Sequence, residues 1–369
     1  MSVGSSEVAE AVAPPARPIR VVMVVNERAP EGNMVRRAGV FAALLAPEFD
    51  VEVIETPSRP LLSSLRAADL AYVIDPGRIG FPAALAGWLA QRPVVVEMGD
   101  PQGALYRTQG RGLLSRTAGE FIDWLVVHRA AAVVLRGRGM ADVLPVRVPW
   151  IEIPDGVEVD RFVPGADGEL RKTLGIPPDG LVAGLAGSLR RGRRREGIYG
   201  WDLVEALNLL RDQPVWALIV GGGEGVPELQ RRAEALGVSD RLIIPGYTPH
   251  SEMPRYVAAM DVCLSRQTND AVGRSRTTAK LPEYLACDRY VLATAVGGAA
   301  EVLPAEMLLP YEGSLDPLHP ARLAERLREL VPRQPELRRG AGTRSIALER
   351  YAYPVLAQRL AALMQRVAA

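Results

Sequence analysis

The amino-acid sequence predicts an α/β protein made of two doubly wound, parallel-sheet domains. Short continuous runs of Val, Ile and Leu alternate with helical patterns, as is typical of parallel strands that helices cover on both faces. The alternation is interrupted at residues 163–180, which are rich in Pro, Gly and charge, and then restarts. The length of 369 residues is sufficient for two domains with separate cores.

The N-terminal domain is expected over residues 18–162. Residues 1–17 before it are small and polar, contain proline and lack the apolar core of a signal peptide, so we expect a disordered tail. The predicted strands are 19–25, 51–54, 70–74, 94–97, 131–135 and 150–153. The predicted helices between them are 34–45, 82–90, 118–129 and 139–144. This order implies βαβ units and a parallel sheet.

The segment 163–180 is expected to be a linker around one short helix, and the C-terminal domain to occupy residues 181–350. Its predicted strands are 181–186, 215–220, 241–244, 262–264, 290–293 and 307–309. Its predicted helices are 201–210, 227–236, 253–259, 279–286 and 320–330. A last helix lies in 351–369, and packing back on the N-terminal domain is one alternative for it.

The composition excludes several classes of protein. The net charge of +1 gives no overall basic field for nucleic acid. Cys263 and Cys287 lie in apolar surroundings and are expected to be buried free thiols. The three histidines lack metal-ligand spacing and no Asp-x-Asp pair follows a strand, so no metal is expected. No apolar run approaches the ~18 residues of a membrane span, and we expect a cytoplasmic protein.

Lys280 stands out because only two of the 44 Lys and Arg residues are lysines. It lies at an apparent helix start, three residues before Glu283. One helical turn that carries a cation and a carboxylate can hold a phosphate with the first group and a sugar diol with the second. The simpler alternative is an exposed ion pair that stabilises the helix by ~0.2–0.5 kcal/mol.

An ordered series of motifs accompanies this segment and resembles the retaining family 4 glycosyltransferases of the GT-B fold. The resemblance covers residues 19 to 366, and the order of the motifs is more specific than any one of them. The motifs are IPDGVEVDRF at 153–162, GGGE at 221–224, LGVSDRLIIPGY at 236–247, MDVCLS at 260–265, TTAKLPEYLA at 277–286 and GGAAE at 297–301.

The resemblance implies two Rossmann-like domains that face each other across a cleft. It implies an enzyme that transfers a sugar, with retention at the anomeric carbon, from a UDP- or GDP-linked donor on the C-terminal domain to an acceptor on the N-terminal domain. Neither a metal nor a cofactor is expected. We expect the acceptor to be a small soluble molecule, such as a secondary-metabolite intermediate.

The resemblance also implies roles for the residues beside the nucleotide. Glu283 matches the position that accepts hydrogen bonds from the ribose hydroxyls. Lys280 and Arg190 are expected to stabilise the charge that develops on the β-phosphate. Gly222, Tyr247 and Thr278 would lie near the nucleotide, although turn, core or edge roles are alternatives for them.

The loop after the first strand of the C-terminal domain departs from the family pattern. Ser188 and Tyr199 stand at positions where the family commonly has Arg and Lys. Arg190 and one of Arg193, Arg194 and Arg195 are therefore expected to contact the diphosphate. A solvated arginine-rich loop is the alternative.

A second departure concerns the donor sugar. Counting back eight residues from Glu283 gives Ser275, where the family commonly has a second Glu. Arg274, Arg276 and Thr277 complete this loop. Its cations would contact the diphosphate or suit an unusual donor sugar.

On the acceptor side, Gly32 and Asn33 suit a turn whose amides face the ligand, and Asp100 follows the strand VVVEM. Asp100 would orient the acceptor nucleophile or accept its proton. A turn or helix-cap role is the alternative, and the departing phosphate is another candidate base.

Three rival functions remain open on the sequence alone. They are a nucleotide-sugar epimerase on the same fold, transfer to a lipid or polysaccharide acceptor, and a catalytically silent binding protein. A nicotinamide dehydrogenase is disfavoured because no Gly-x-Gly-x-x-Gly follows the first strand. Residues 107–138 hold six arginines and two acids, which leaves weak peripheral membrane contact open.

Overall fold

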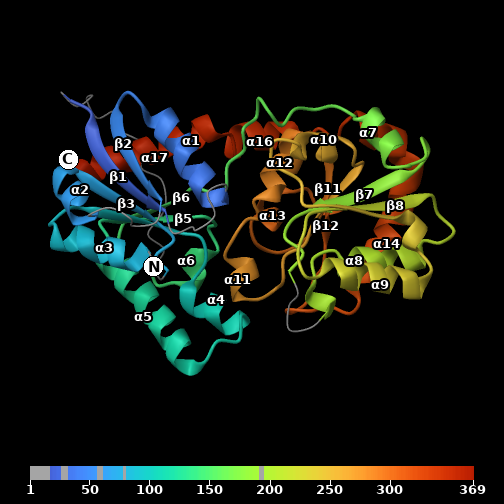
Figure 1. Ribbon diagram of the computed structural model, residues 1–369, viewed down its shortest axis with the longest axis horizontal. Helices are drawn as coiled ribbons and strands as arrows, with labels where there is room; N and C mark the ends of the chain where they lie inside the picture. Colours follow the sequence, from blue (N-terminus) through green and yellow to red (C-terminus); the bar gives the residue numbers. More distant parts are fainter. Residues whose placement is uncertain (1–16, 26–31, 56–60, 78–79, 191–194) are drawn as a thin grey trace. The chain divides into compact units, whose positions relative to one another are not determined.

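The computed structural model describes residues 17–25, 32–55, 61–77, 80–190 and 195–369. The chain forms two compact units (Figure 1): unit 1 extends to Pro154 and takes up Tyr353–Ala369, and unit 2 is Asp155–Ala352. Each unit contains a six-stranded sheet in which all the described pairings are parallel. The predicted fold class, two doubly wound α/β sheets, is confirmed.

The sheet of unit 1 has the order β2-β1-β3-β4-β5-β6. Val21 of β1 lies opposite Val51 of β2 and Leu70 of β3, so the strand order reverses at β1. Strands β3, β4 and β5 are buried along their whole length, which explains why they read as continuous apolar runs. The strands are β1 Ile19–Val25, β2 Phe49–Glu55, β3 Leu70–Ile74, β4 Val94–Met98, β5 Ala132–Leu135 and β6 Trp150–Glu152.

Helices cover both faces of this sheet. Phe41 of α1 and Leu360 of α17 pack on one face with Tyr72, while Leu65 of α2 and Val126 of α5 pack on the other. The helices of unit 1 are α1 Asn33–Leu45, α2 Leu61–Ala67, α3 Gly80–Leu89, α4 Gln102–Thr108, α5 Leu113–Arg129, α6 Met140–Val143 and α17 Tyr353–Ala368.

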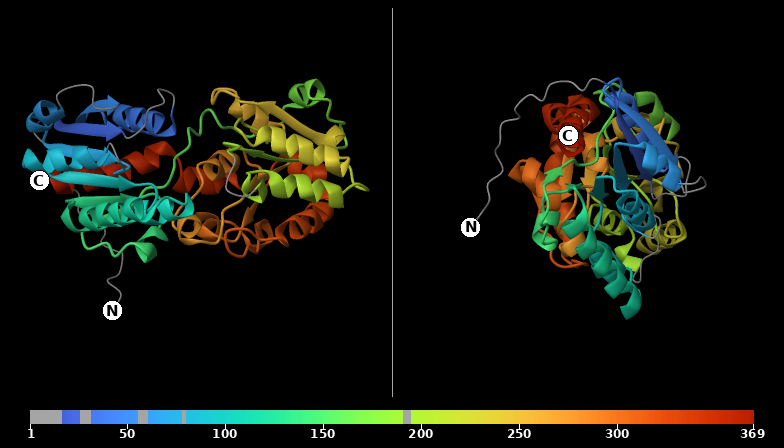
Figure 2. Two further views of the ribbon diagram at one scale, coloured as in Figure 1. Left: turned by 60° about the horizontal axis from the view of Figure 1, so that its bottom comes forward. Right: turned by 90° about the vertical axis from the view of Figure 1, so that its left-hand side faces the viewer.

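The last helix of the chain, α17, lies beside α1 (Figures 1 and 2). The ring of Tyr353 at its start meets the ring of Phe41 edge to face, with centroids 5.6 Å apart. The C-terminal segment therefore completes the core of the N-terminal unit.

A buried ion cluster lies inside unit 1. Glu97 of β4 is fully buried and accepts hydrogen bonds from Arg37 Nε (3.0 Å), Arg136 Nε (2.7 Å) and the Tyr72 hydroxyl (2.6 Å). Burial alone would raise the pKa of Glu97, but the charges of Arg37 and Arg136 outweigh it and hold the pKa below its ordinary value. Because two cations share one buried carboxylate, removal of any one of these three side chains would leave buried charge uncompensated.

The sheet of unit 2 has the order β12-β11-β10-β7-β8-β9. Ala183 of β7 lies between Val262 of β10 and Ala217 of β8, so the strand order reverses at β7, where ligands bind in sheets of this type. The strands are β7 Leu181–Ala186, β8 Val215–Val220, β9 Leu242–Gly246, β10 Val262–Ser265, β11 Tyr290–Thr294 and β12 Leu308–Leu309.

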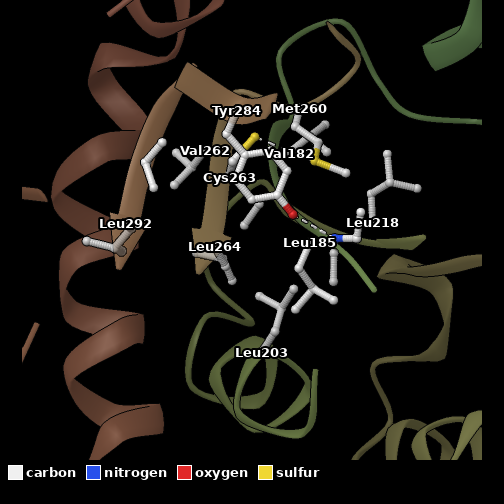
Figure 3. Packing of buried hydrophobic residues seen from close by; sticks show 14 of the residues in the cluster. Val182, Leu185, Leu203, Leu218, Met260, Val262, Cys263, Leu264, Tyr284 and Leu292 are labelled. Atoms are coloured by element: carbon white, nitrogen blue, oxygen red, sulfur yellow. Dashed lines mark hydrogen bonds between the residues drawn. The ribbon is translucent and has the colours of Figure 1, made fainter. Parts of the chain in front are cut away.

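The core of unit 2 lies around β7 and β10 (Figure 3). The hydroxyl of Tyr284 reaches the sheet from α12 and accepts the N–H of Ala186 at the end of β7 (2.8 Å). Both cysteines are buried free thiols, as predicted. Burial raises the pKa of Cys287 to about 12 and the pKa of Cys263 well above its ordinary value, so neither thiol ionises near neutral pH.

The helices of unit 2 are α7 Gly168–Thr173, α8 Trp201–Leu209, α9 Val226–Leu236, α10 Met253–Ala258, α11 Ala271–Arg274, α12 Lys280–Ala286, α13 Gly297–Val302, α14 His319–Leu330, α15 Gln334–Arg339 and α16 Arg344–Arg350. Single 3₁₀ turns are Arg195–Gly197, Ser239–Arg241, Ala305–Met307 and Val331–Arg333. Among the helices of the described ranges, none has the length and apolar character needed to cross a bilayer.

Two features differ from the sequence-based expectation. The segment predicted as a linker, 163–180, lies inside unit 2, because Leu170 and Ile176 join its core, and the units divide at Pro154. Six helices were not predicted: α2, α4, α11, α13, α15 and α16. They are four to seven residues long, too short for a helical period to repeat convincingly.

Candidate functional site

Lys280 is the first residue of α12, and Ala279 precedes it without a side-chain cap. The Lys280 side chain is half-buried. Within the described ranges its ammonium has no hydrogen bond and no ion pair. In particular, Lys280 and Glu283 do not form the i,i+3 pair that was the simpler alternative. A cation whose charge no described residue compensates therefore stands at the start of α12.

Glu283 is buried and binds a histidine instead. The Nε2–H of His250 donates to Glu283 Oε1 at 2.9 Å, because a carboxylate can only accept. The second carboxylate oxygen, Oε2, is buried and has no hydrogen-bond partner within the described part of the chain. A buried carboxylate oxygen without a donor is costly. A ligand hydroxyl at this position would supply the missing donor.

His250 is a site residue that sequence reasoning missed. Its ring packs against Phe162, with centroids 5.4 Å apart, and its carbonyl accepts a hydrogen bond from Arg161. The spacing of the histidines indicates no metal site, and His250 lies 33 residues from Glu283 in the sequence. The available signal was its place shortly after β9, where a parallel sheet collects its ligand-binding residues.

The loop between β10 and α12 is fixed from within. The Asp270 carboxylate accepts the N–H groups of Val272 and Gly273 at 3.1 and 2.9 Å. The amide nitrogen of Gln267 donates to the carbonyls of Gly273 and Arg276 at 3.1 and 2.9 Å. These bonds give the predicted donor-sugar loop one defined shape.

The four predicted residues of that loop are not equally placed. Ser275 is fully buried and its hydroxyl donates to the Val272 carbonyl at 2.9 Å, so this serine supports the loop. Thr277 is also buried, against Gly298, where an added Cβ would come within 1.8 Å of its hydroxyl oxygen. Arg274 is exposed and Arg276 is half-buried, and these two carry the loop's positive charge.

Thr278, predicted beside the nucleotide, follows this loop. Its hydroxyl oxygen lies 3.0 Å from that of Ser265, the last residue of β10. The bond ties the start of α12 to the carboxyl end of a central strand. Thr278 therefore helps to fix the position of Lys280.

The arginines after β7 are placed differently from one another. Arg190 is exposed, and its guanidinium forms no hydrogen bond or ion pair within the described ranges. Arg195 forms an ion pair with Glu228 at 3.5 Å and lines a groove of about 1000 Å³ along α8. Neither Lys280 nor Glu283 lines that groove. Arg193 and Arg194, the other candidates, lie outside the described residues.

The glycines after β8 join two loops of the protein itself. Gly221 has φ of 148°, and a Cβ there would come within 1.9 Å of the Gly187 carbonyl oxygen. The N–H of Leu189 donates to the Gly222 carbonyl at 2.9 Å. Gly222 also faces Tyr247, whose side chain is exposed. Glycine is thus required at position 221 because its backbone lies close to the loop after β7.

The predicted acceptor-side residues lie at the carboxyl edge of the sheet of unit 1. Gly32 precedes α1, and Asn33 at its first position accepts a hydrogen bond from Arg36 at 2.7 Å. Asp100 is half-buried between β4 and α4. The N–H of Gly99 before it donates to Asp75 Oδ1 at 2.8 Å. Residues 26–31, the rest of the predicted turn, lie outside the described residues.

No group of three or more His, Cys, Asp or Glu side chains in the described ranges is arranged to hold a metal ion. The cations of unit 2 in this part of the chain are the Lys280 ammonium at the start of α12 and the arginines of the loops. Such a set suits an anion, and the carboxylate of Glu283 suits a hydroxyl beside it.

Residues 182–332 match the family described as glycosyl transferases group 1. The matched segment includes Lys280, Glu283, His250 and the donor-sugar loop. This segment is thus similar to the group 1 glycosyltransferases. The resemblance read from the ordered motifs is confirmed for it.

Two relatives act on the same kind of acceptor. The chain is 29% identical over 193 residues to the 2-deoxystreptamine glucosyltransferase of Streptomyces kanamyceticus, covering 49% of this chain and 47% of that protein. It is 28% identical over 254 residues to the 2-deoxystreptamine N-acetyl-D-glucosaminyltransferase of Streptomyces fradiae, covering 65% of this chain and 54% of that protein. The chain thus spans about half the length of these relatives.

The fold resembles that of HepE from Anabaena, solved in complex with UDP and glucose. The TM-score is 0.71 at 16% sequence identity, and the match covers 94% of this chain and 100% of that chain. The two Rossmann-like units have the GT-B fold that the motif series predicted.

Proposed function

We propose that the protein is a glycosyltransferase that moves a sugar from a nucleoside diphosphate donor, UDP- or GDP-linked, to a hydroxyl of its acceptor. The observation that carries the proposal is the Glu283 carboxylate, held by His250 through one oxygen and without a partner on the other. The carboxylate lies one helical turn from an uncompensated Lys280. A ribose diol and a diphosphate would satisfy both groups.

In this proposal unit 2 binds the donor. Negative charge grows on the β-phosphate as the glycosidic bond breaks, and a fixed cation meets that charge at little reorganisation cost. Lys280 supplies one such cation, and Arg190, Arg274 and Arg276 in the loops are candidates for others. Transfer needs no metal in this proposal, because protein cations stabilise the charge of the leaving diphosphate. The sugar is transferred with retained anomeric configuration.

Unit 1 would bind the acceptor through the edge that carries Gly32, Asn33 and Asp100. Asp100 orients the nucleophilic hydroxyl, and the departing phosphate serves as the alternative base. The two relatives glycosylate 2-deoxystreptamine, according to their names. We therefore propose a small soluble polyhydroxylated acceptor of the secondary-metabolite type.

A thermal-shift screen with UDP, GDP, TDP and ADP tests donor binding. A specific ligand at 100 times its Kd adds ~2.7 kcal/mol to the free energy of unfolding. One of the four nucleotides should therefore raise the Tm of the protein clearly more than the other three. Equal effects of all four nucleotides, or none, would contradict a nucleotide-sugar site. Hydrolysis or transfer of the matching NDP-sugar, followed by NMR of the anomeric proton, separates an enzyme from a silent binding protein and reports retention.

A further inference from the structure

The solvent-facing side of α5 carries four large apolar residues. Leu113, Leu114, Phe121 and Trp124 are 72%, 87%, 56% and 52% exposed. Helical spacing places these four residues on one side of the helix, here called the apolar face of α5. A surface helix ordinarily turns its polar side outward. In α5 the buried side comprises Gly119, Asp123, Val126 and Val127, so apolar residues lie on the outer side as well as on the buried side.

The aromatic part of the apolar face of α5 is continuous. The ring of Phe121 stacks on that of Trp124 with centroids 6.0 Å apart, and Trp124 contacts the ring of His128 at 4.9 Å. In Figures 1 and 2 the hairpin of α4 and α5 projects from the body of unit 1. Contiguous exposed aromatic surface of this kind marks an interaction site.

Cations surround this face. Arg111, Arg116 and Arg129 lie on the hairpin, and none of them has an ion pair with a carboxylate in the described ranges. Glu120, the exposed acid of α5, is already neutralised by Arg107 at 2.7 Å. The surface that α5 presents is therefore apolar at its centre and positively charged at its rim.

The hairpin holds this surface in a fixed orientation. The carboxylate of Asp123 accepts the N–H groups of Gln102 and Gly103 at the start of α4, at 3.0 and 2.9 Å. At Gly119 a Cβ would come within 3.0 Å of the α4 backbone, so the two helices pack closely. An ordered apolar face loses little conformational freedom when it binds.

We propose that the apolar face of α5 docks unit 1 onto an anionic lipid surface. Trp and Phe side chains prefer the headgroup boundary, and arginines at their rim are attracted to anionic lipid. Charge complementarity selects this occupant. A second copy of the chain would bring the same uncompensated arginines against the first and repel it. The proposal rests on the hairpin alone and holds for a soluble or a lipid-borne acceptor.

Flotation of the full chain with vesicles tests the proposal. The vesicles are phosphatidylcholine, either pure or with about 30 mol% phosphatidylglycerol. The anionic vesicles should bind at least about tenfold more strongly, and this advantage should shrink with added salt. The triple variant Leu114→Glu, Phe121→Glu, Trp124→Glu should lose at least about tenfold in partitioning. Leu348→Glu, at an exposed leucine of α16 in unit 2, should leave it unchanged.

A second measurement needs no disruptive variant. Cys263 and Cys287 are buried, so a polarity-sensitive dye on Thr117→Cys labels α5 selectively. Its emission should shift to the blue with anionic vesicles. Unchanged emission, or equal flotation of the wild type and the triple variant, would overturn the proposal. So would a dimer, seen by light scattering without vesicles, that the triple variant dissociates, because a second copy would then be the occupant.

Discussion

Glu283 and His250 show what single residues contribute to the site. The pair fixes one carboxylate oxygen and leaves the other buried without a donor. Burying such a group costs ~1–3 kcal/mol, which a hydroxyl ligand would recover. Lys280 and Glu283 could be predicted because they are three residues apart on one helical turn. His250 could not, because its bond to Glu283 closes only when β9 and α12 are in place.

Lys280→Ala should lower kcat for the matching NDP-sugar by about 100-fold, because a fixed charge that meets the developing phosphate acts mainly in the transition state. Steady-state kinetics measure the effect. Lys172→Ala is a matched control, since the other lysine of the chain is exposed and pairs with Glu169. A loss confined to KM would show that Lys280 contributes to ground-state binding only.

Asp288 is the residue that turns the chain from α12 into β11. It has φ of 55°, and its Oδ1 accepts the N–H groups of Thr343 and Arg344 at 2.6 and 3.1 Å at the start of α16. Asp288→Ala removes the acceptor and keeps the left-handed backbone, so it should cost about 2 kcal/mol of unfolding free energy. Asp288→Gly should recover about 1 kcal/mol of this loss. Urea unfolding measures both variants, and a glycine variant less stable than the alanine variant would refute the argument.

Asp123 should make the α4–α5 hairpin more stable in mild acid. Burial raises its pKa to about 6, although the hydrogen bonds from the two N–H groups of α4 lower it. The folded state therefore binds the proton more tightly than the unfolded state. Protonation of Asp123 therefore stabilises the fold by up to about 3 kcal/mol. This stabilisation is complete below the unfolded pKa near 4 and is lost as the pH rises through 6.

The measurement is the difference in unfolding free energy between the wild type and Asp123→Asn at pH 4 and pH 7. The unfolding free energy of the wild type should fall relative to that of the variant as the pH rises, because asparagine does not titrate. A constant difference across this range would show that Asp123 has an ordinary pKa in the folded protein.

Elements differed in how far the sequence predicted them. The strands were predicted because those buried on both faces, such as β3 and β7, are continuous apolar runs. Helix α5 was expected from residue 118 and begins at Leu113, because its first turn carries exposed leucines where polar residues mark an ordinary helix. The α11 turn depends on the Asp270 side chain, which has no periodic signal.

At the scale of the whole molecule, the chain passes from unit 1 to unit 2 after Pro154, next to the buried ion cluster around Glu97. Arg37 donates to the carbonyls of Ile153 and Pro154, at 2.9 and 2.8 Å, and its charge is balanced by Glu97. The boundary at Pro154 could not be predicted from composition, because Pro and Gly also occur in 163–180, inside unit 2. The position of a boundary depends on which unit buries the segment.

Glu97→Gln should destabilise unit 1 by about 3–5 kcal/mol, because Arg37 and Arg136 would then be buried without a full counter-charge. Thermal unfolding should show a lower transition for unit 1, while the nucleotide-dependent shift from unit 2 remains. Glu205→Gln, at a partly exposed pair with Arg232, is the control and should cost less than about 1 kcal/mol. Equal effects of the two substitutions would contradict this account of the cluster.

The most direct test of a ribose-binding Glu283 compares two ligands on two proteins. Calorimetry would give the Kd of the nucleoside diphosphate selected by the screen and of its 2′,3′-dideoxy analogue, on the wild type and on Glu283→Ala. The wild type should prefer the ribose form by about tenfold, and the variant should bind both forms equally. If the variant keeps the full preference for ribose, Glu283 does not bind those hydroxyls and the proposed donor site is wrong.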